Sequence, residues 1–181
     1  MTSDALERVL LVGFMGSGKT SVGRVVAARL GWRFVDFDDE IVKEAGASIP
    51  EIFERHGEPY FRDLEAAVAR RLLSGRAVVL GSGGGWGAVL GRLTTLPVET
   101  ESFWLQVSAP TAVHRASGEP GARPLLDRGD ALREASRLLA EREPFYRQAK
   151  WAVDTEHSSV EDVSARVLEI LMREHPEIFI E

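Results

Sequence analysis

The segment Gly13-Phe14-Met15-Gly16-Ser17-Gly18-Lys19-Thr20 constrains this chain more than any other part of its sequence. It matches the phosphate-binding pattern G-x-x-x-x-G-K-[ST], with the apolar run 9–12 before it and a helical pattern after it. In that setting, backbone N–H groups and a helix N-terminus surround a phosphate. Lys19 then reaches the outer phosphates, and the Thr20 hydroxyl binds Mg²⁺. An ordinary glycine-rich turn is the alternative, but the complete motif favours a protein that binds a nucleoside triphosphate.

The bulk composition narrows the class of protein. A chain of 181 residues with 44% hydrophobic and 28% charged residues fits one globular domain, which we expect to span residues 1–181. The net charge of −6 argues against nucleic acid as a partner. No apolar run approaches the length of a membrane span, and residues 1–8 lack a signal-peptide pattern. We therefore expect a cytoplasmic protein that contacts neither nucleic acid nor membrane. A monomer is also expected, although the composition does not determine the oligomeric state.

Short apolar runs alternate with helical patterns, which predicts an α/β fold. Strands are expected near 7–12, 33–37, 76–81, 102–107 and 150–154. Helices are expected near 19–30, 38–46, 49–74 (with a break at His56-Gly57), 86–95, 110–117, 130–147 and 159–173. This alternation indicates a mainly parallel sheet with helices on both faces. The polar, turn-rich stretch that starts at Ser117 predicts a mobile lid at about 117–127.

Two acidic residues, Asp36 and Asp38, lie at the end of the second predicted strand. In extended chain their side chains project to the same side, at the sheet edge where open α/β sheets bind ligands. One carboxylate would hold the water shell of Mg²⁺ and the other would meet an acceptor hydroxyl. Alternatively, Asp38, Asp39 and Glu40 only cap the next helix, which explains Asp39 and Glu40 well but Asp36 less well.

A run of three glycines, Gly83 to Gly85, follows the third predicted strand. That strand does not end in the aspartate that many GTPases and motor ATPases carry there. Consecutive glycines indicate that the backbone approaches a ligand closely, although a turn without a ligand would also use them. The position of the run after a parallel strand favours the ligand. Trp86, beside it, is a candidate pocket residue.

Three arginines are candidate partners of charged groups. Arg62 and Arg142 have acidic neighbours at helical spacing, so a solvated ion-pair surface is the simpler interpretation of both. Arg123, at the edge of the expected lid, is either a turn residue or a cation for a transferring phosphoryl group. Spacing alone does not decide between these alternatives.

Together these segments resemble the shikimate kinase family along almost the whole chain. The resemblance is carried by residues 13–20, 34–38, 48–53, 57–62, 83–85, 123–126, 142–147 and 153–155. It implies a three-layer P-loop kinase fold with a five-stranded parallel sheet of order 2-3-1-4-5. It also implies ATP-dependent phosphorylation of the 3-hydroxyl of shikimate, a step in chorismate and aromatic amino acid biosynthesis.

The resemblance further implies a role for each matching residue. Nucleotide-binding residues would be Gly16, Ser17, Gly18, Lys19, Thr20, Ser21, Arg115 and Arg123, with Arg115 stacked on adenine. Shikimate-binding residues, mostly from a region at about 36–65, would be Asp38, Arg62, Gly83, Gly84, Gly85 and Arg142. The two arginines Arg62 and Arg142 would hold the carboxylate of shikimate. Thr20 would bind Mg²⁺ with Asp36 in its outer shell, and the catalytic residues would be Lys19, Asp38 (the candidate base) and Arg123.

The chain also departs from the family pattern. Trp86-Gly87 replaces a small residue and an apolar one, and Glu156 stands where the family often has an arginine near adenine. Two other functions are therefore considered. One is a related kinase acting on gluconate or a nucleoside monophosphate, and the other is a catalytically silent nucleotide-binding module. Asp38 together with an intact Lys19-Thr20 pair favours a kinase over the silent module.

Overall fold

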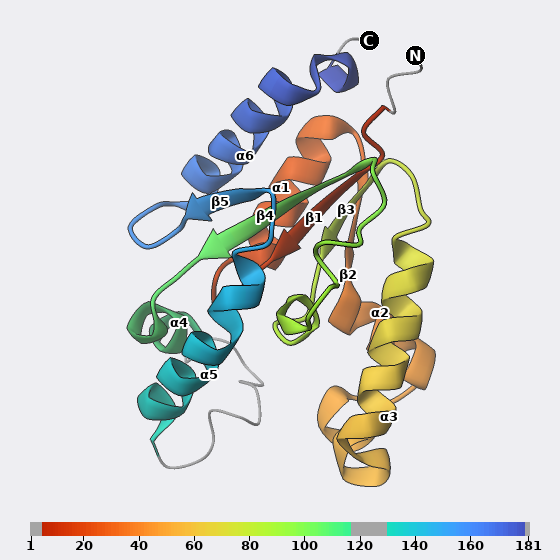
Figure 1. Ribbon diagram of the computed structural model, residues 1–181, viewed down its shortest axis with the longest axis vertical. Helices are drawn as coiled ribbons and strands as arrows, with labels where there is room; N and C mark the ends of the chain where they lie inside the picture. The colour runs from red at the N-terminus through yellow and green to blue at the C-terminus, as the bar shows by residue number, and fades with distance from the viewer. Residues whose placement is uncertain (1–4, 117–129, 180–181) are drawn as a thin grey trace.

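A five-stranded parallel sheet organises residues 5–116 and 130–179, which are the residues that this computed structural model describes (Figure 1). The strands are β1 (Arg8–Val12), β2 (Arg33–Asp36), β3 (Val78–Gly81), β4 (Thr100–Gln106) and β5 (Trp151–Asp154). Their order is β2-β3-β1-β4-β5, and every pairing is parallel. The expected sheet order 2-3-1-4-5 is therefore confirmed. All five carboxyl ends meet at one edge of the sheet.

Helices connect the strands and cover the sheet. They are α1 (Lys19–Leu30), α2 (Phe37–Ala45), α3 (Ile49–Leu72), α4 (Ala109–Ala116), α5 (Ala131–Tyr146) and α6 (Val160–Glu174), with 3₁₀ turns η1 (Trp86–Ala88) and η2 (Pro176–Phe179). The expected lid at 117–127, Arg123 included, lies outside the described residues. None of the helices in the described part of the chain combines the length and the hydropathy needed to cross a membrane.

The central strand β1 shows why helices cover both faces of the sheet. Val9 and Leu11 pack in one cluster with residues of α1 and α6, whereas Leu10 and Val12 pack in the other with residues of α2, α3, α4 and α5. All four side chains are fully buried. Each contributes about 1.5–3 kcal/mol by leaving water. Because four successive residues of β1, Val9 to Val12, are apolar, both faces of the sheet need a covering layer of helices.

The long helix α3 bends where a break was predicted. Gly57 has φ +78°, a left-handed conformation that glycine adopts without the steric cost of a Cβ. Pro59 follows and has no N–H to donate to the helix. The bend separates a first segment, capped by Ser48, from the segment that carries Arg62.

The helix predicted over 86–95 is wrong. The chain makes only the 3₁₀ turn η1 there, followed by further turns up to Thr95. Gly87 lies against β1, where a Cβ would come within 3.2 Å of Val12 Cβ, and Gly91 has φ +84°. The left-handed conformation at Gly91 ends any continuous helix, so an apolar pattern alone was misleading.

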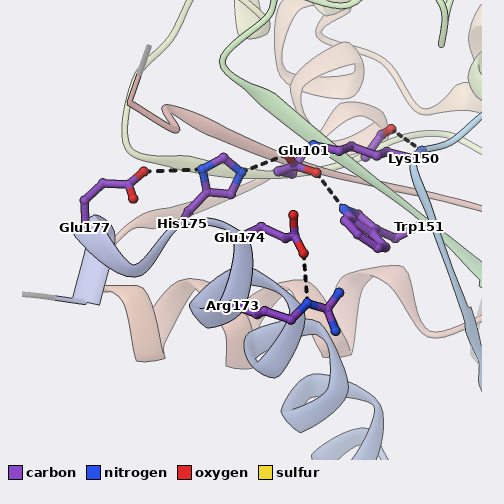
Figure 2. Close-up of polar contacts among 8 residues, drawn as sticks. Glu101, Lys150, Trp151, Arg173, Glu174, His175 and Glu177 are labelled. Carbon is purple, nitrogen blue, oxygen red and sulfur yellow. Dashed lines mark hydrogen bonds and ion pairs between the residues drawn. The ribbon is translucent and has the colours of Figure 1, made fainter. Parts of the chain in front are cut away.

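A polar cluster fastens the end of α6 to the amino-terminal edge of the sheet (Figure 2). Buried Glu101 of β4 accepts hydrogen bonds from Lys150, from Trp151 Nε1 (2.7 Å) and from His175 at the end of α6 (2.8 Å). Burial alone would raise the pKa of Glu101, but the bonds from Lys150, His175 and Trp151 together hold that pKa below its usual value. This cluster lies at the opposite edge from the glycine loops.

Candidate active site

The phosphate-binding loop at 13–20 joins β1 to α1, and its glycines are required by its geometry. A Cβ on Gly13 would lie 2.6 Å from the Leu105 carbonyl oxygen, and one on Gly16 would lie 2.7 Å from that of Ala112. Gly18 caps α1 with φ +92°. The loop therefore packs directly against β4 and α4, and its last residues begin the helix whose N-terminus attracts anions.

Lys19 is buried at the start of α1, with only 7% of its surface exposed. Its Nζ donates hydrogen bonds to the carbonyl oxygens of Gly13 (2.9 Å) and Phe14 (2.8 Å), and lies 3.4 Å from Ser17 Oγ. The ammonium group is thus held inside the curve of the loop. A cation in that position can reach the outer phosphates of a bound nucleotide.

Asp36 connects the phosphate loop to the next helix. Its Oδ2 accepts a hydrogen bond from Thr20 Oγ1 (2.9 Å), while its Oδ1 accepts one from the Asp38 N–H (2.9 Å) and so caps α2. Because α2 begins at Phe37, the expectation that Asp36 and Asp38 project to one side of an extended strand is wrong. Asp36 faces Thr20, so its carboxylate and the Thr20 hydroxyl lie together beside the phosphate loop.

Asp38 faces the glycine run instead. A Cβ on Gly83 would lie 2.7 Å from Asp38 Oδ1 and 3.3 Å from Glu65 Oε1, so no larger residue fits without displacing a carboxylate. Gly83 must lack a side chain because there is no space for one, whereas Gly57 is glycine because of its left-handed backbone conformation. The structure brings Asp38 of α2, Glu65 of α3 and the run after β3 into one place.

Arg62 lies along the same run. A Cβ on Gly85 would come within 2.7 Å of Arg62 Nη1. The guanidinium pairs with Glu65 on one side (3.1 Å) and Glu58 on the other (3.1 Å). The predicted ion pairs at helical spacing are present. Glu58 is 64% exposed but Glu65 is 1% exposed, so only part of this ion-pair group is solvated.

Arg142 lies on α5, beside the phosphate loop. Its guanidinium lies 5.8 Å from the ring centroid of Phe14, a buried residue of the phosphate loop. One turn later on the same helix, the buried Tyr146 hydroxyl donates a hydrogen bond to the Gly84 carbonyl oxygen. Helix α5 therefore carries Arg142 next to the phosphate loop and also fixes the middle of the glycine run.

Arg115 joins the phosphate loop to the turn after β5. It donates hydrogen bonds to the carbonyl oxygens of Gly16 (3.3 Å) and Thr155 (2.7 Å), and its stacking on adenine stays a prediction. Glu156 accepts hydrogen bonds from the Ser108 N–H (2.8 Å) and Oγ (2.7 Å) and from the Thr111 hydroxyl. The bonds from Thr111 and Ser108 lower the pKa of Glu156 to about 2. Glu156 thus holds the start of α4 to the turn after β5.

Sequence reasoning missed three residues that shape the site: Glu65, Arg92 and Tyr146. Arg92 Nη1 lies 3.4 Å from Glu65 Oε2 and donates to the Trp86 carbonyl oxygen (3.2 Å). Trp86 itself is buried and packs edge-on against Phe37, with ring centroids 5.3 Å apart. The acidic residue three positions after Arg62 was visible in the sequence, but its burial and its contact with Arg92 were not.

The groups present fit a nucleotide with its metal ion. Mg²⁺ takes oxygen ligands, commonly one or two from the protein with the rest from phosphates and water. Thr20 and Asp36 supply such oxygens beside the loop. Among the residues at 5–116 and 130–179, no group of three or more His, Cys, Asp or Glu side chains could hold a metal ion by itself. A metal here would therefore bind together with the phosphates.

Known proteins that are similar to this chain include shikimate kinases. A family model described as shikimate kinase matches residues 15–172. The shikimate kinase of Nitrobacter winogradskyi is 52% identical over 141 residues, covering 77% of this chain but 64% of that protein, so this chain spans less than two thirds of that relative. The shikimate kinase of Persephonella marina is 38% identical over 163 residues, covering 90% of this chain and 98% of that protein.

A solved structure supports the same assignment. The shikimate kinase from Acinetobacter baumannii in complex with shikimate has a TM-score of 0.87 and 34% sequence identity, covering 94% of this chain and 96% of that one. The family match covers most of the chain, and the fold agrees with it from β1 to α6. The chain belongs to the shikimate kinase family, whose members are phosphotransferases.

Proposed function

We propose that this chain transfers the γ-phosphoryl group of ATP to the 3-hydroxyl of shikimate, giving shikimate 3-phosphate and ADP. The observation that carries the proposal is the meeting of Asp38 and Arg62 at the run Gly83–Gly85, on the sheet edge that also holds Lys19. A carboxylate there suits a hydroxyl, and a guanidinium suits a carboxylate. The site thus combines recognition of a hydroxy acid with a triphosphate loop.

The proposed acceptor end positions a small acid between α2, α3 and α5. Arg62 and Arg142 would share the shikimate carboxylate, for which two guanidinium forks are well suited. The glycine run would lie along the ring because it has no side chains to block the approach. Asp38 would accept a hydrogen bond from the attacking hydroxyl and so aim it at the phosphorus. Orientation of this kind provides much of the rate enhancement in phosphoryl transfer.

At the part of the proposed site that binds ATP, positive groups neutralise the negative charge of the phosphates. Lys19 would release its bonds to the Gly13 and Phe14 carbonyl oxygens and follow the transferring phosphoryl group. Thr20 and Asp36 would hold Mg²⁺, which supplies charge neutralisation at the phosphates when bound. Arg123, from the expected lid, would add a further positive charge, and Arg115 would contact adenine. Closure of the lid would exclude water from the transfer.

We also propose that the protein acts as a cytoplasmic monomer in aromatic amino acid biosynthesis. Lys19, Asp38 and Arg62, which we propose to act on ATP and shikimate, all belong to this one chain, which supports the proposal of a monomer. ATP, the proposed co-substrate, is available in the cytoplasm. Sedimentation of the purified protein at working concentration, with and without shikimate, tests the monomer directly.

The position of phosphorylation tests the proposal. Purified protein is incubated with ATP, Mg²⁺ and shikimate, and the product is examined by phosphorus NMR. The expected product couples phosphorus to the proton on C3. Lys19→Met serves as the matched inactive control because it keeps the length of the side chain and removes its charge. A product phosphorylated at another hydroxyl would contradict the assigned orientation.

A further inference from the structure

Arg92 lies in the turns that follow η1, and it contacts the proposed acceptor site through Glu65 and Trp86. Its side chain is 20% exposed, and its guanidinium carbon lies 5.4 Å from the centroid of the Trp86 ring. Its Nη1 donates to the Trp86 carbonyl oxygen (3.2 Å) and pairs with Glu65 Oε2 (3.4 Å). Arg92 therefore connects the residue after the glycine run to a buried carboxylate.

Glu65 is the residue that Arg92 and Arg62 share. Both guanidinium groups point an Nη1 atom at the same oxygen, Oε2, from 3.4 Å and 3.1 Å. Glu65 is 1% exposed, so its charge is poorly screened by water. Removal of one cation partner from a buried carboxylate is strongly unfavourable, because the buried charge is left uncompensated.

The charge balance around Arg62 depends on Arg92. Arg62 also pairs with Glu58, which is 64% exposed. The charges of Arg62, Glu58 and Glu65 sum to −1, and Arg92 brings the sum for these four ion-paired side chains to zero. Without Arg92, Arg62 alone would neutralise the buried Glu65, and the local field would repel an anion.

We propose that Arg92 is a positioning residue for the substrate carboxylate, acting through Glu65 on Arg62. The inference rests on the proposed function, because it takes a carboxylate-bearing substrate as the partner of Arg62. By neutralising part of the Glu65 charge, Arg92 leaves the positive charge of Arg62 available for the substrate. Arg92 itself does not contact the substrate.

Two variants distinguish the effect of the charge of Arg92 from the effect of its hydrogen bond to the Trp86 carbonyl oxygen. Arg92→Gln keeps a donor for the Trp86 carbonyl oxygen but removes the charge, whereas Arg92→Lys keeps the charge. Arg70→Ala is the matched control, since exposed Arg70 lines the same hollow beside Trp86 and Arg92. The KM and kcat are measured for shikimate and for its methyl ester, which keeps the ring and its hydroxyls but lacks the negative charge. The KM for ATP is measured in parallel, and thermal unfolding reports on folding.

The expected result is a loss specific to the charged substrate. Arg92→Gln raises the KM for shikimate about tenfold, while its kcat and its KM for ATP stay within about twofold of the wild type. The KM for the ester does not change, and both Arg92→Lys and Arg70→Ala keep a KM for shikimate near that of the wild type. Equal losses with shikimate and its ester, or no loss with either, would overturn the role of Arg92. A wild-type protein without turnover of shikimate would instead refute the proposed function itself.

Discussion

Thr20 Oγ1 donates a 2.9 Å hydrogen bond to Asp36 Oδ2, and this bond joins the start of α1 to the end of β2. The other oxygen of the same carboxylate caps α2 through the Asp38 N–H. Asp36 thus has two separable tasks, one in holding the helix and one beside the proposed Mg²⁺ site. The two tasks can be distinguished because an asparagine performs only the first.

Asp36→Asn is expected to raise the Mg²⁺ concentration needed for half-maximal rate while leaving stability almost unchanged. Asparagine is as good a helix cap as aspartate, whereas Asp36→Ala also loses the cap and about 1 kcal/mol of stability. Titration of Mg²⁺ in the kinase assay and urea unfolding measure the two effects. An Mg²⁺ dependence of Asp36→Asn equal to that of the wild type would remove Asp36 from the metal site.

Arg62→Ala is expected to raise the KM for shikimate about tenfold or more, because a charge-assisted fork to a carboxylate is lost. The KM for ATP should change little, since Arg62 lies on α3 and not on the phosphate loop. Arg55→Ala is the control, because the ion pair of Arg55 with Glu51 on the same helix is exposed. Steady-state kinetics with each substrate varied in turn decides the matter. An unchanged KM for shikimate in Arg62→Ala would contradict the assigned role.

Gly83→Ala is expected to reduce kcat/KM for shikimate by about a hundredfold, because a 1 Å displacement of a catalytic group has effects of that size. The added Cβ would meet Asp38 Oδ1 at 2.7 Å, and the carboxylate must move away. Gly46→Ala, at φ +63° with no atom within 4 Å, carries only backbone strain and should leave the kinetics intact. Retained activity in Gly83→Ala would show that Asp38 has no fixed position there.

The contribution of Glu101 to stability should depend on pH. Its pKa is lower in the folded chain than the ordinary value of 4.5, so its contribution is fully present above pH 4.5 and is lost as the pH falls through the folded pKa. Glu101→Gln should therefore lower the unfolding midpoint at pH 7, and the difference from the wild type should shrink below pH 4.5. Activity at pH 7 should be unchanged, because Glu101 lies near the start of β4, whereas the phosphate loop and the glycine run follow the carboxyl ends of their strands. A difference that stays constant down to pH 3 would contradict this account.

Much of the fold follows from local sequence patterns. Three features depend only on a few adjacent residues, and each is present in the structure: the apolar run of β1, the glycines of the phosphate loop and the break at Gly57. The sheet order came from the family resemblance and not from periodicity. The helix expected at 86–95 failed because Gly91 has a left-handed conformation and because Gly87 packs on Val12, a long-range contact that no local pattern contains.

The site was predicted less completely than the fold, for the same reason. Arg62 was identified, yet its neighbour Glu65 was interpreted as part of an exposed face. Whether an acidic residue is buried depends on what packs over it, and here Arg92 does so from 27 positions away in the sequence. The different partners of Asp36 and Asp38 were missed because α2 begins at Phe37, and Asp38 therefore lies on a helix and not on an extended strand.

The central claim is that this chain phosphorylates shikimate, and release of ADP with separate acceptors tests it most directly. Purified protein with ATP and Mg²⁺ is offered shikimate, gluconate and AMP in turn, with Lys19→Met as the blank. The account predicts ADP release with shikimate far above the blank, and release near the blank with gluconate and AMP. Release only with gluconate or AMP, or with none of the three, would contradict it.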